Sequence, residues 1–324
     1  MANKAHYKND VPPPQEEPLH VETITWKNMT WVNIVQPTER EINYLAEHYH
    51  FHPLALDDCL SRKQLPKIDI YPGYLYFVFH FPLYNKETRI STKRQWSAFI
   101  GENFMVTIHT GEMKTMNALF RDCQVNEESR REYFAYGSGY LLYRLLDRII
   151  DSYFPVLDKI LSLIEEIEDA VFDETAEATE EISILRRDII TQRAVMFPTR
   201  TIFIEMENKL KRFSRTDVTV YYNDLMDHIN KICETLDEAQ EIIEVFKDAD
   251  YTLATYRINR VTRLLTIFST IVLPFIIISS LYGMNVGLPG GLEAGSLKTF
   301  FILITVMALL AISMLIFFRH KRWI

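Results

Sequence analysis

Two long uncharged runs near the end of the chain constrain its fold more than any other feature. The first run covers residues 264–282 (LLTIFSTIVLPFIIISSLY) and the second covers residues 299–318 (TFFILITVMALLAISMLIFF). An α-helix rises 1.5 Å per residue, so about 20 apolar residues cross roughly 30 Å of hydrocarbon. Both runs therefore predict membrane-spanning helices, and a buried helix pair in a soluble core is the alternative. A proline in the first run, Pro274, is tolerated in such a helix.

Basic side chains flank the outer ends of this predicted hairpin. They are Arg257, Arg260 and Arg263 before the first run, and Arg319, Lys321 and Arg322 after the second. The segment between the runs carries only Glu293 and Lys298 as charged residues. The positive-inside rule then predicts a multi-pass protein of the plasma membrane with both termini in the cytoplasm. The first 20 residues are polar and proline-rich, without the apolar region of a signal peptide.

Charge and cysteine usage exclude several classes of protein. The formal net charge is −8, which argues against a nucleic-acid partner because phosphates require a basic face. Cys59, Cys123 and Cys233 stand singly, without a CxxC pair, as expected of packing residues in a reducing cytosol. The sequence shows no Walker A run and no pairing of a nucleophile with a base, so it gives no support to an enzyme.

The sequence before the hairpin divides into two regions, one with strand-like patterns and one with helical patterns. Aromatic and β-branched residues alternate in 74–81 and 102–109, which predicts strands, while 39–50 and 52–60 predict short helices. From about residue 139, helical periodicity takes over through 141–172 and 182–210, which we expect to pair as antiparallel helices. A third helical pattern begins near Thr216 and meets no glycine or proline before Pro274. It predicts one stalk helix of more than 60 residues, roughly 100 Å long.

These patterns predict an α+β fold class with four parts. The parts are a disordered polar tail (1–20), a cytoplasmic α/β domain (21–138), a cytoplasmic helical region with the stalk helix (139–263), and a two-helix transmembrane domain (264–324). An acidic stretch between the two antiparallel helices, residues 165–181, is either a solvated helix tip or a surface that concentrates cations.

One face of the first span is polar. The 3-4-3-4 spacing of a helical seam, started at Asn259, selects Asn259, Thr262, Thr266, Ser269, Leu273, Ile276 and Ser280. Hydroxyls at regular spacing in a membrane helix either hold helices together or line water, and the seam alone fits both. Two spans enclose little space, so a pore needs several copies of the chain. Leu273 and Ile276 would then form an apolar collar.

The segment between the two runs carries a recognisable motif. YGMN at 282–285 follows a proline-containing apolar helix and precedes a second span that ends in RHKRWI. With these flanks it resembles the CorA family of divalent-cation transport proteins. The segments FHPLALDDCL, PKIDIYPGYLYFVFHF, ENFMVTIH, RIIDSYFPVLDKI and YYNDLMDHI are similar to family segments in the same order. The resemblance covers about residues 40–324.

The resemblance implies a homopentameric funnel in a lipid bilayer, with the first spans around a central pore and the second spans outside them. It places Gly283, Met284 and Asn285 at the outer mouth as a selectivity filter, and it implies magnesium uptake with cobalt or nickel as minor substrates. Five Asn285 amides would hold hydrated Mg2+ through its water shell, since this ion dehydrates reluctantly. A helix C-cap is the alternative role for Asn285. The resemblance implies no organic cofactor.

The resemblance also implies feedback by cytosolic Mg2+ bound between neighbouring subunits. The matching positions are Asp224, within YYNDLMDHI, and Asp248. Solvated acids on a helix face are the alternative interpretation of both. The partner carboxylate of the family falls on Asn85, which departs from the usual pair of acids.

Other functions stay open. The loop NVGLPGGLEAG is nearly neutral and is similar to the zinc-transporting ZntB branch, which raises zinc, cobalt or nickel transport with proton coupling as an alternative. A membrane-anchored cytoplasmic sensor or scaffold is an alternative of another class. His48, His50 and His52, near Cys59, suggest either a zinc site or packing and surface histidines.

Overall fold

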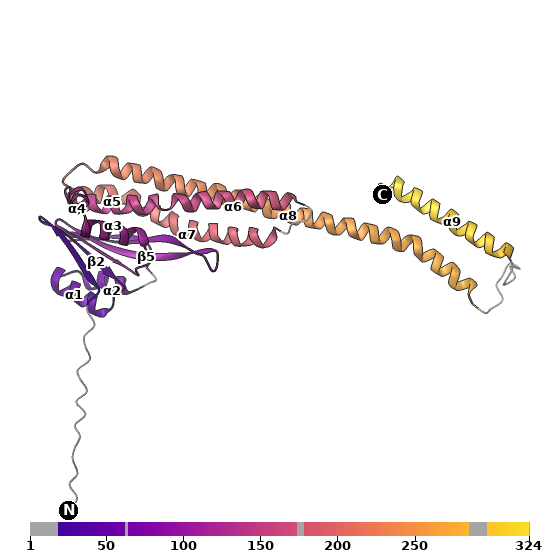
Figure 1. The fold of residues 1–324 in the computed structure, drawn as a ribbon, viewed down its shortest axis with the longest axis horizontal. Helices are drawn as coiled ribbons and strands as arrows, with labels where there is room; N and C mark the ends of the chain where they lie inside the picture. The colour runs from indigo at the N-terminus through magenta and orange to yellow at the C-terminus, as the bar shows by residue number, and fades with distance from the viewer. Residues whose placement is uncertain (1–18, 62–63, 174–177, 285–296, 324) are drawn as a thin grey trace, which may run out of the picture. The chain divides into compact units, whose positions relative to one another are not determined.

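The computed structural model describes residues 19–61, 64–173, 178–284 and 297–323 of the 324-residue chain. The described residues fall into two compact units, which are divided between Phe246 and Lys247. Figure 1 shows the helices and strands of both units.

The first unit is built on a mixed sheet. Its strands are β1 (Val21–Trp26), β2 (Met29–Val35), β3 (Lys67–Tyr71), β4 (Tyr74–Asn85), β5 (Ile90–Gly101) and β6 (Phe104–His109). They lie in the order β1-β2-β6-β5-β4-β3, with β2 and β6 parallel and every other pair antiparallel. The strands predicted at 74–81 and 102–109 are confirmed as β4 and β6.

Two short helices cover one face of this sheet. They are α1 (Glu39–Tyr49) and α2 (Pro53–Leu60), close to the predicted helices. Side chains from alternate positions of the strands, such as Tyr76, Phe99 and Val106, join Leu45 of α1 in one buried cluster. The ring of Phe51, between the two helices, stacks on Phe99 with centroids 4.0 Å apart.

Long helices lie against the opposite face. The remaining helices of the unit are α3 (Lys114–Val125), α4 (Glu127–Phe134), α5 (Ser138–Asp151), α6 (Phe154–Phe172), α7 (Thr179–Leu210), a short 3-10 turn η1 (Lys211–Phe213), and the first part of α8 (Thr219–Tyr282). The ring of Phe79 stacks on Trp96 at 4.6 Å and meets the edge of Phe203 from α7 at 6.1 Å. Burying each of these rings contributes about 1.5–3 kcal/mol, so α7 is fixed firmly to the sheet.

The helical pattern at 141–172 is two helices and not one. The chain turns at Ser152 and Tyr153 between α5 and α6. Pro155 occupies the first turn of α6, where its missing N–H costs nothing, whereas in a continuous helix it would remove a hydrogen bond and clash with the preceding turn. The predicted antiparallel pair is therefore formed by α6 and α7, which lie side by side in Figure 1.

The stalk pattern is confirmed as one helix, α8, of 64 residues with Pro274 inside it. The last helix is α9 (Leu297–His320). Within the described residues, α8 and α9 each contain a stretch long and apolar enough to cross a membrane, with the α9 stretch at Phe300–His320.

Candidate functional site

The face of α8 that carries the polar seam is open in the second unit. Every seam residue is exposed: Asn259, Thr262, Thr266, Ser269, Leu273, Ile276 and Ser280. Within the span, the covered positions of the same helix are Ile267, which is buried, and five half-buried residues, Ile271, Val272, Pro274, Phe275 and Ile278. At 3.6 residues per turn all of them except Val272 lie on the side opposite the seam. The seam is therefore free for another copy of the chain or for water.

Two threonine hydroxyls on this helix donate hydrogen bonds to carbonyls of the preceding turn. The Oγ1 of Thr266 donates to the carbonyl of Thr262 at 2.7 Å, and that of Thr270 donates to the carbonyl of Thr266 at 2.7 Å. Each hydroxyl has its donor paired inside the helix, so its lone pairs are left to accept hydrogen bonds. Water molecules around a hydrated cation are donors of that kind. Thr266 belongs to the seam, and Thr270 does not.

The same two threonines border a groove of about 560 Å³ between α8 and α9. Its other walls are Ser313, Met314, Phe317, Phe318 and Trp323. Both threonines therefore border the same groove, but only Thr266 belongs to the seam.

The glycine of the motif lies in the last turn at the end of α8. The N–H of Gly283 donates to the carbonyl of Ser279 at 2.9 Å, and that of Met284 donates to Leu281 at 3.4 Å. Gly283 does not have a positive φ. A Cβ on Gly283 would lie 3.1 Å from the oxygen of Ser279, so a side chain there would require a shift of a few tenths of an ångström. Met284 is exposed, and Asn285 lies outside the described residues.

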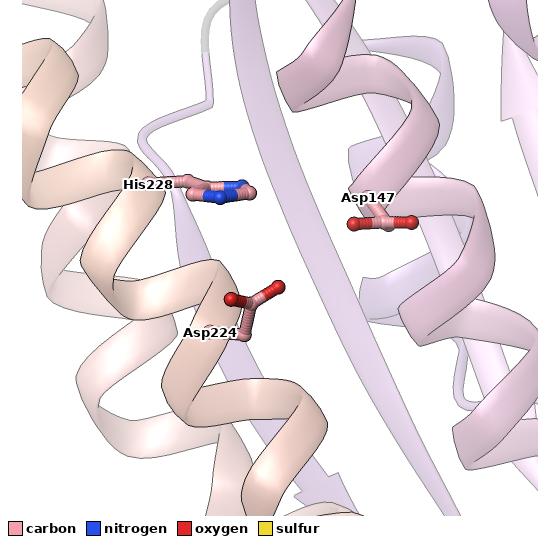
Figure 2. A group of neighbouring side chains, drawn as sticks. All are labelled: Asp147, Asp224 and His228. Carbon is pink, nitrogen blue, oxygen red and sulfur yellow. The ribbon is translucent and has the colours of Figure 1, made fainter.

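A second candidate site lies in the first unit, between α5 and α8. Figure 2 shows Asp147 on α5 facing Asp224 and His228 on α8. One potential ligand atom from each residue lies within 4.8 Å of the others. Asp224 and His228 are four residues apart and so share one face of α8. The sequence singled out Asp224 alone. Asp147 and His228 belong to α5 and α8 patterns that carry many other charges, so nothing in the spacing marked them.

The surroundings of this cluster are acidic. The Oδ1 of Asp151, at the end of α5, lies 3.9 Å from the Nδ1 of His228. Burial raises the pKa of Asp147, and the neighbouring carboxylates of Asp151 and Asp224 raise it further. Burial, followed by the charge of Asp147, raises the pKa of Tyr143 to about 12. A divalent cation would relieve the repulsion among these carboxylates.

The other acid predicted from the sequence does not join this cluster. Asp248 is exposed in the second unit, and its Oδ1 lies 3.4 Å from the Nζ of Lys247. Asn85, at the end of β4, accepts the backbone N–H of Glu87 at 2.9 Å through its Oδ1. This bond closes the β4–β5 turn, which gives Asn85 a structural role.

The histidines of HYHFH lie at the end of α1 and the start of α2, where they contact or cap the helix backbone. The Nδ1 of His48 lies 2.8 Å from the carbonyl of Tyr44, and His50 ends α1 with a φ of 53°. The Nδ1 of His52 accepts the N–H of Leu54 at 3.2 Å and caps α2. Burial raises the pKa of the Cys59 thiol to about 12. Within the described ranges, these residues form no group with metal-ligand geometry.

Comparison with known proteins extends along nearly the whole chain. The family described as "CorA-like Mg2+ transporter protein" matches residues 26–321. The "Putative metal ion transporter YfjQ" of Bacillus subtilis is 31% identical over 90% of this chain and 89% of its own length. The "Cobalt/magnesium transport protein CorA" of Thermotoga maritima is 26% identical over 93% of this chain and 84% of its own.

The fold has solved counterparts. The complete structure of the CorA magnesium transporter from Methanocaldococcus jannaschii superposes with a TM-score of 0.76 at 22% identity, over 93% of this chain and 94% of that one. A more distant relative, the "Zinc transport protein ZntB" of Yersinia enterocolitica, is 22% identical over 58% of this chain and 57% of its own.

Proposed function

The chain belongs to the CorA-like Mg2+ transporter protein family, and on this premise we propose that it takes up hydrated Mg2+ through a pore lined by the α8 seam. Five copies would surround the axis as a homopentamer, with α8 inside and α9 outside. The observation that carries this proposal is the exposure of all seven seam residues, on the side of α8 opposite most of its covered positions.

The chemistry of the seam suits a cation that keeps its water. Mg2+ demands octahedral geometry and usually retains several waters. Threonine oxygens whose protons are already donated to the helix, as at Thr266, accept hydrogen bonds from such waters. The membrane part of the seam carries no Asp, Glu, Lys or Arg, so it would neither bind the ion too tightly nor repel it. Leu273 and Ile276 would supply an apolar collar that closes the pore by dewetting.

The outer mouth would be formed by the end of α8 and the residues after it. Gly283, Met284 and Asn285 form the proposed selectivity filter, with a ring of Asn285 amide oxygens toward the arriving ion. The driving force is electrical. An inside-negative potential of 100 mV favours the entry of a divalent ion by roughly 4.6 kcal/mol, so no nucleotide is required.

Placement in the membrane follows from the charges beside the spans. Basic residues before the span of α8 and after α9 favour a plasma-membrane protein with both termini in the cytoplasm. In this proposal the chain comprises a tail (1–20), an α/β domain (21–138), a helical region (139–263) and a transmembrane domain (264–324).

Feedback by cytosolic cations would act at Asp224. Its position among Asp147, Asp151 and His228 supports a cation-responsive role, because the cluster repels itself until a cation arrives. Asp248 would be a second acidic position of this control. The structural role of Asn85 weakens its case as a ligand.

Ion flux into vesicles containing the purified protein tests the proposal. Wild type should carry Mg2+ under an inside-negative potential, and Asn285→Ala should lose most of its selectivity for Mg2+ over other cations. Equal flux and equal selectivity in both proteins would remove Asn285 from the filter. The absence of flux in wild-type vesicles would favour the alternative of a membrane-anchored sensor or scaffold.

A zinc transporter of the ZntB type is the second candidate, favoured by the ZntB relative and by the imidazole of His228 beside Asp224. Zinc prefers nitrogen or sulfur ligands such as imidazole. The seam offers only oxygen donors, so the seam itself does not favour zinc. The same vesicles, given Mg2+ or Zn2+ with and without a proton gradient, separate the two. Zinc flux that exceeds magnesium flux and follows the proton gradient would replace our first proposal.

A further inference from the structure

A cavity of about 580 Å³ lies on the side of the sheet that α1 and α2 cover. Its walls come from the end of α2, from β5, and from the segments that follow β2 and β6. We propose that this cavity binds a small organic anion, whose phosphate or carboxylate group contacts Lys93 and whose organic part lies against Pro37, Leu60 and Ile108. The site lies within the first unit and does not depend on transport.

The cavity lies where the two parallel strands of the sheet end. β2 and β6 run side by side, with Val35 opposite His109 at their last positions. The next residues along the chain, Gln36 and Thr110, both line the cavity. Ligands of α/β sheets bind outside the carboxyl ends of the strands, so the topology places the cavity at a position where such sheets accept ligands.

The connections after these two strands also diverge. After β2 the chain enters α1, whose Leu45 packs with Val32 on one face of the sheet. After β6 it enters α3, whose Phe120 meets Trp31 at 4.9 Å between ring centroids. Trp31 and Val32 are consecutive on β2, so their side chains lie on opposite faces. Connections that leave neighbouring strands toward opposite faces open a crevice between them, and this is where the cavity lies.

The walls of the cavity are fixed by bonds within the protein. The Nε2 of Gln95 donates to the carbonyl of Ser61 at 2.9 Å and holds the end of α2 against β5. The Oγ of Ser97 lies 3.2 Å from the hydroxyl of Tyr76, and the Sγ of Cys59 donates to a carbonyl of α2 at 3.1 Å. The cavity is therefore formed before any ligand arrives, as most small-molecule sites are.

The charges around the cavity favour an anion. Lys93 lines it, is exposed, and forms no salt bridge with any residue that the structure describes. Of the described residues in the lining, Glu112 is the only acid, and its carboxylate pairs with Arg94. Burial, followed by the charge of Lys93, lowers the pKa of His80 to about 4. The charge of Lys93 therefore reaches into the protein without a counterion among these residues.

The start of α1 does not compete for the anion. A helix N-terminus attracts negative charge, but here the buried carboxylate of Glu41 already accepts the N–H of Thr38 at 2.9 Å. The protein supplies its own anion at that point. Lys93 is thus the group that would bind the anion of a ligand.

Gln36 has an unusual backbone for its residue type. Its φ is 55°, in the left-handed region, and its N–H donates to the carbonyl of His109 at 2.8 Å. Residues other than glycine that are held in this region are concentrated at ligand sites. The side chain of Gln36 is exposed, and its amide can donate to the anion bound by Lys93.

The apolar part of the lining determines the class of anion. Pro37, Leu60 and Ile108 provide surface that a bare inorganic ion would leave uncovered. Cavities of roughly 300–1,000 Å³ suit organic ligands, whose apolar surface they bury. An organic phosphate and an organic carboxylate both combine a negative group with such a body.

Binding to the full-length protein in detergent, after removal of divalent cations, tests the inference without a metal bridge. The probes are adenosine monophosphate, citrate, adenosine and inorganic phosphate. We expect adenosine monophosphate or citrate to bind and to raise the unfolding temperature, and the one that binds more tightly identifies phosphate or carboxylate as the preferred group. Adenosine lacks the charge and inorganic phosphate lacks the organic part, so both should bind about tenfold more weakly.

Three variants separate the site from general effects of charge. Lys93→Gln should weaken binding of the organic anion about tenfold, because it removes a charge-assisted hydrogen bond. Lys86→Gln makes the same charge change at an exposed position of the β4–β5 turn and should bind like wild type. Gln36→Gly accommodates the positive φ and removes the amide, so it should be at least as stable as wild type and bind several-fold more weakly.

The outcomes also separate this inference from the proposed function. Lys93 is exposed, so Lys93→Gln should fold, which circular dichroism would verify. The inference is overturned if neither adenosine monophosphate nor citrate binds wild type, or if folded Lys93→Gln binds as tightly as wild type. Unchanged binding in Gln36→Gly would overturn the role of Gln36. Anion binding by a protein without ion flux would support this site and refute transport.

Discussion

The carboxylate of Glu41 accepts the backbone N–H of Thr38 at 2.9 Å, while the side chain of Thr38 caps the first turn of α1. The other oxygen of Glu41 accepts the N–H of His20, just before β1, at 3.1 Å. Glu41 is only 3% exposed, so one buried carboxylate ties the start of α1 to the edge of the sheet.

This arrangement predicts a loss of stability in acid. Burial alone would raise the pKa of Glu41, but the bonds from the Thr38 hydroxyl and from the His20 and Thr38 amides outweigh it and lower the pKa from 4.5 to about 2. A lowered folded pKa stabilises the protein above pH 4.5, and this contribution disappears as the pH falls toward 2. The unfolding temperature of wild type should therefore fall more steeply over this range than that of Glu41→Gln. Glu39→Gln, at an exposed position of the same turn, should behave like wild type, and parallel curves for all three would contradict the assignment.

A pair of isosteric substitutions tests the seam. Thr266 and Thr270 make the same 2.7 Å bond to the preceding turn and border the same groove, but only Thr266 lies on the seam. Thr266→Val should lower Mg2+ flux several-fold, because it removes an oxygen that would accept hydrogen bonds from the water shell of the ion. Thr270→Val should stay within about twofold of wild type. If Thr270→Val lost as much flux as Thr266→Val, the seam would not be the conducting face.

The last turn of α8 gives a prediction for Gly283. A Cβ there lies 3.1 Å from the oxygen of Ser279, which requires a shift of a few tenths of an ångström. Gly283→Ala should therefore fold and insert normally but lower Mg2+ flux, because the shift would misplace the residues that follow. Expression and oligomer size serve as the controls. Full flux in this variant would show that the turn tolerates a side chain and does not position the filter.

Asp188 on α7 gives a prediction about stability alone. This buried carboxylate, 4% exposed, accepts the backbone N–H of Ser91 on β5 and the Nε2 of Gln192 at 2.7 Å. The Tyr153 hydroxyl donates to the Oε1 of Gln192, which fixes the orientation of that amide. In Asp188→Asn the new NH2 group would face one of two donors, so the free energy of unfolding should fall by about 1–3 kcal/mol. Chemical denaturation would measure it, with Asp227→Asn expected to change the stability by less than about 0.5 kcal/mol.

Much of the fold was predictable because its signals are local. The alternation in β4, the short helical pattern at 39–50 and the unbroken periodicity of α8 each occupy one stretch of sequence and need no distant partner. The break between α5 and α6 was missed because apolar periodicity continues across Ser152 and Tyr153, although Pro155 carried the signal. The sheet order was also beyond the sequence, since the parallel contact of β2 with β6 joins strands that about 70 residues separate.

The candidate sites divide in the same way. The seam residues were selected from the spacing within one helix, and all of them are exposed, while their role as a pore lining stays a prediction. The cluster around Asp224 depends on Asp147, which another helix brings close, and on the orientation of His228 beside Phe154. Asp188 is similar, because its partner Ser91 lies on a strand. Contacts of this kind depend on tertiary packing, so no periodic pattern in the sequence reveals them.

The order of the strands places β1 and β3 at the two borders of the sheet, and both carry charge. Glu22 projects from β1, and on β3 the Nζ of Lys67 pairs with Asp58 at 2.7 Å and with Asp69 at 2.6 Å. Proteins confined to one membrane meet at high local concentration, where unguarded strands would pair between neighbours and aggregate. Charged borders oppose such pairing, so copies of this chain can crowd together while their sheets stay separate.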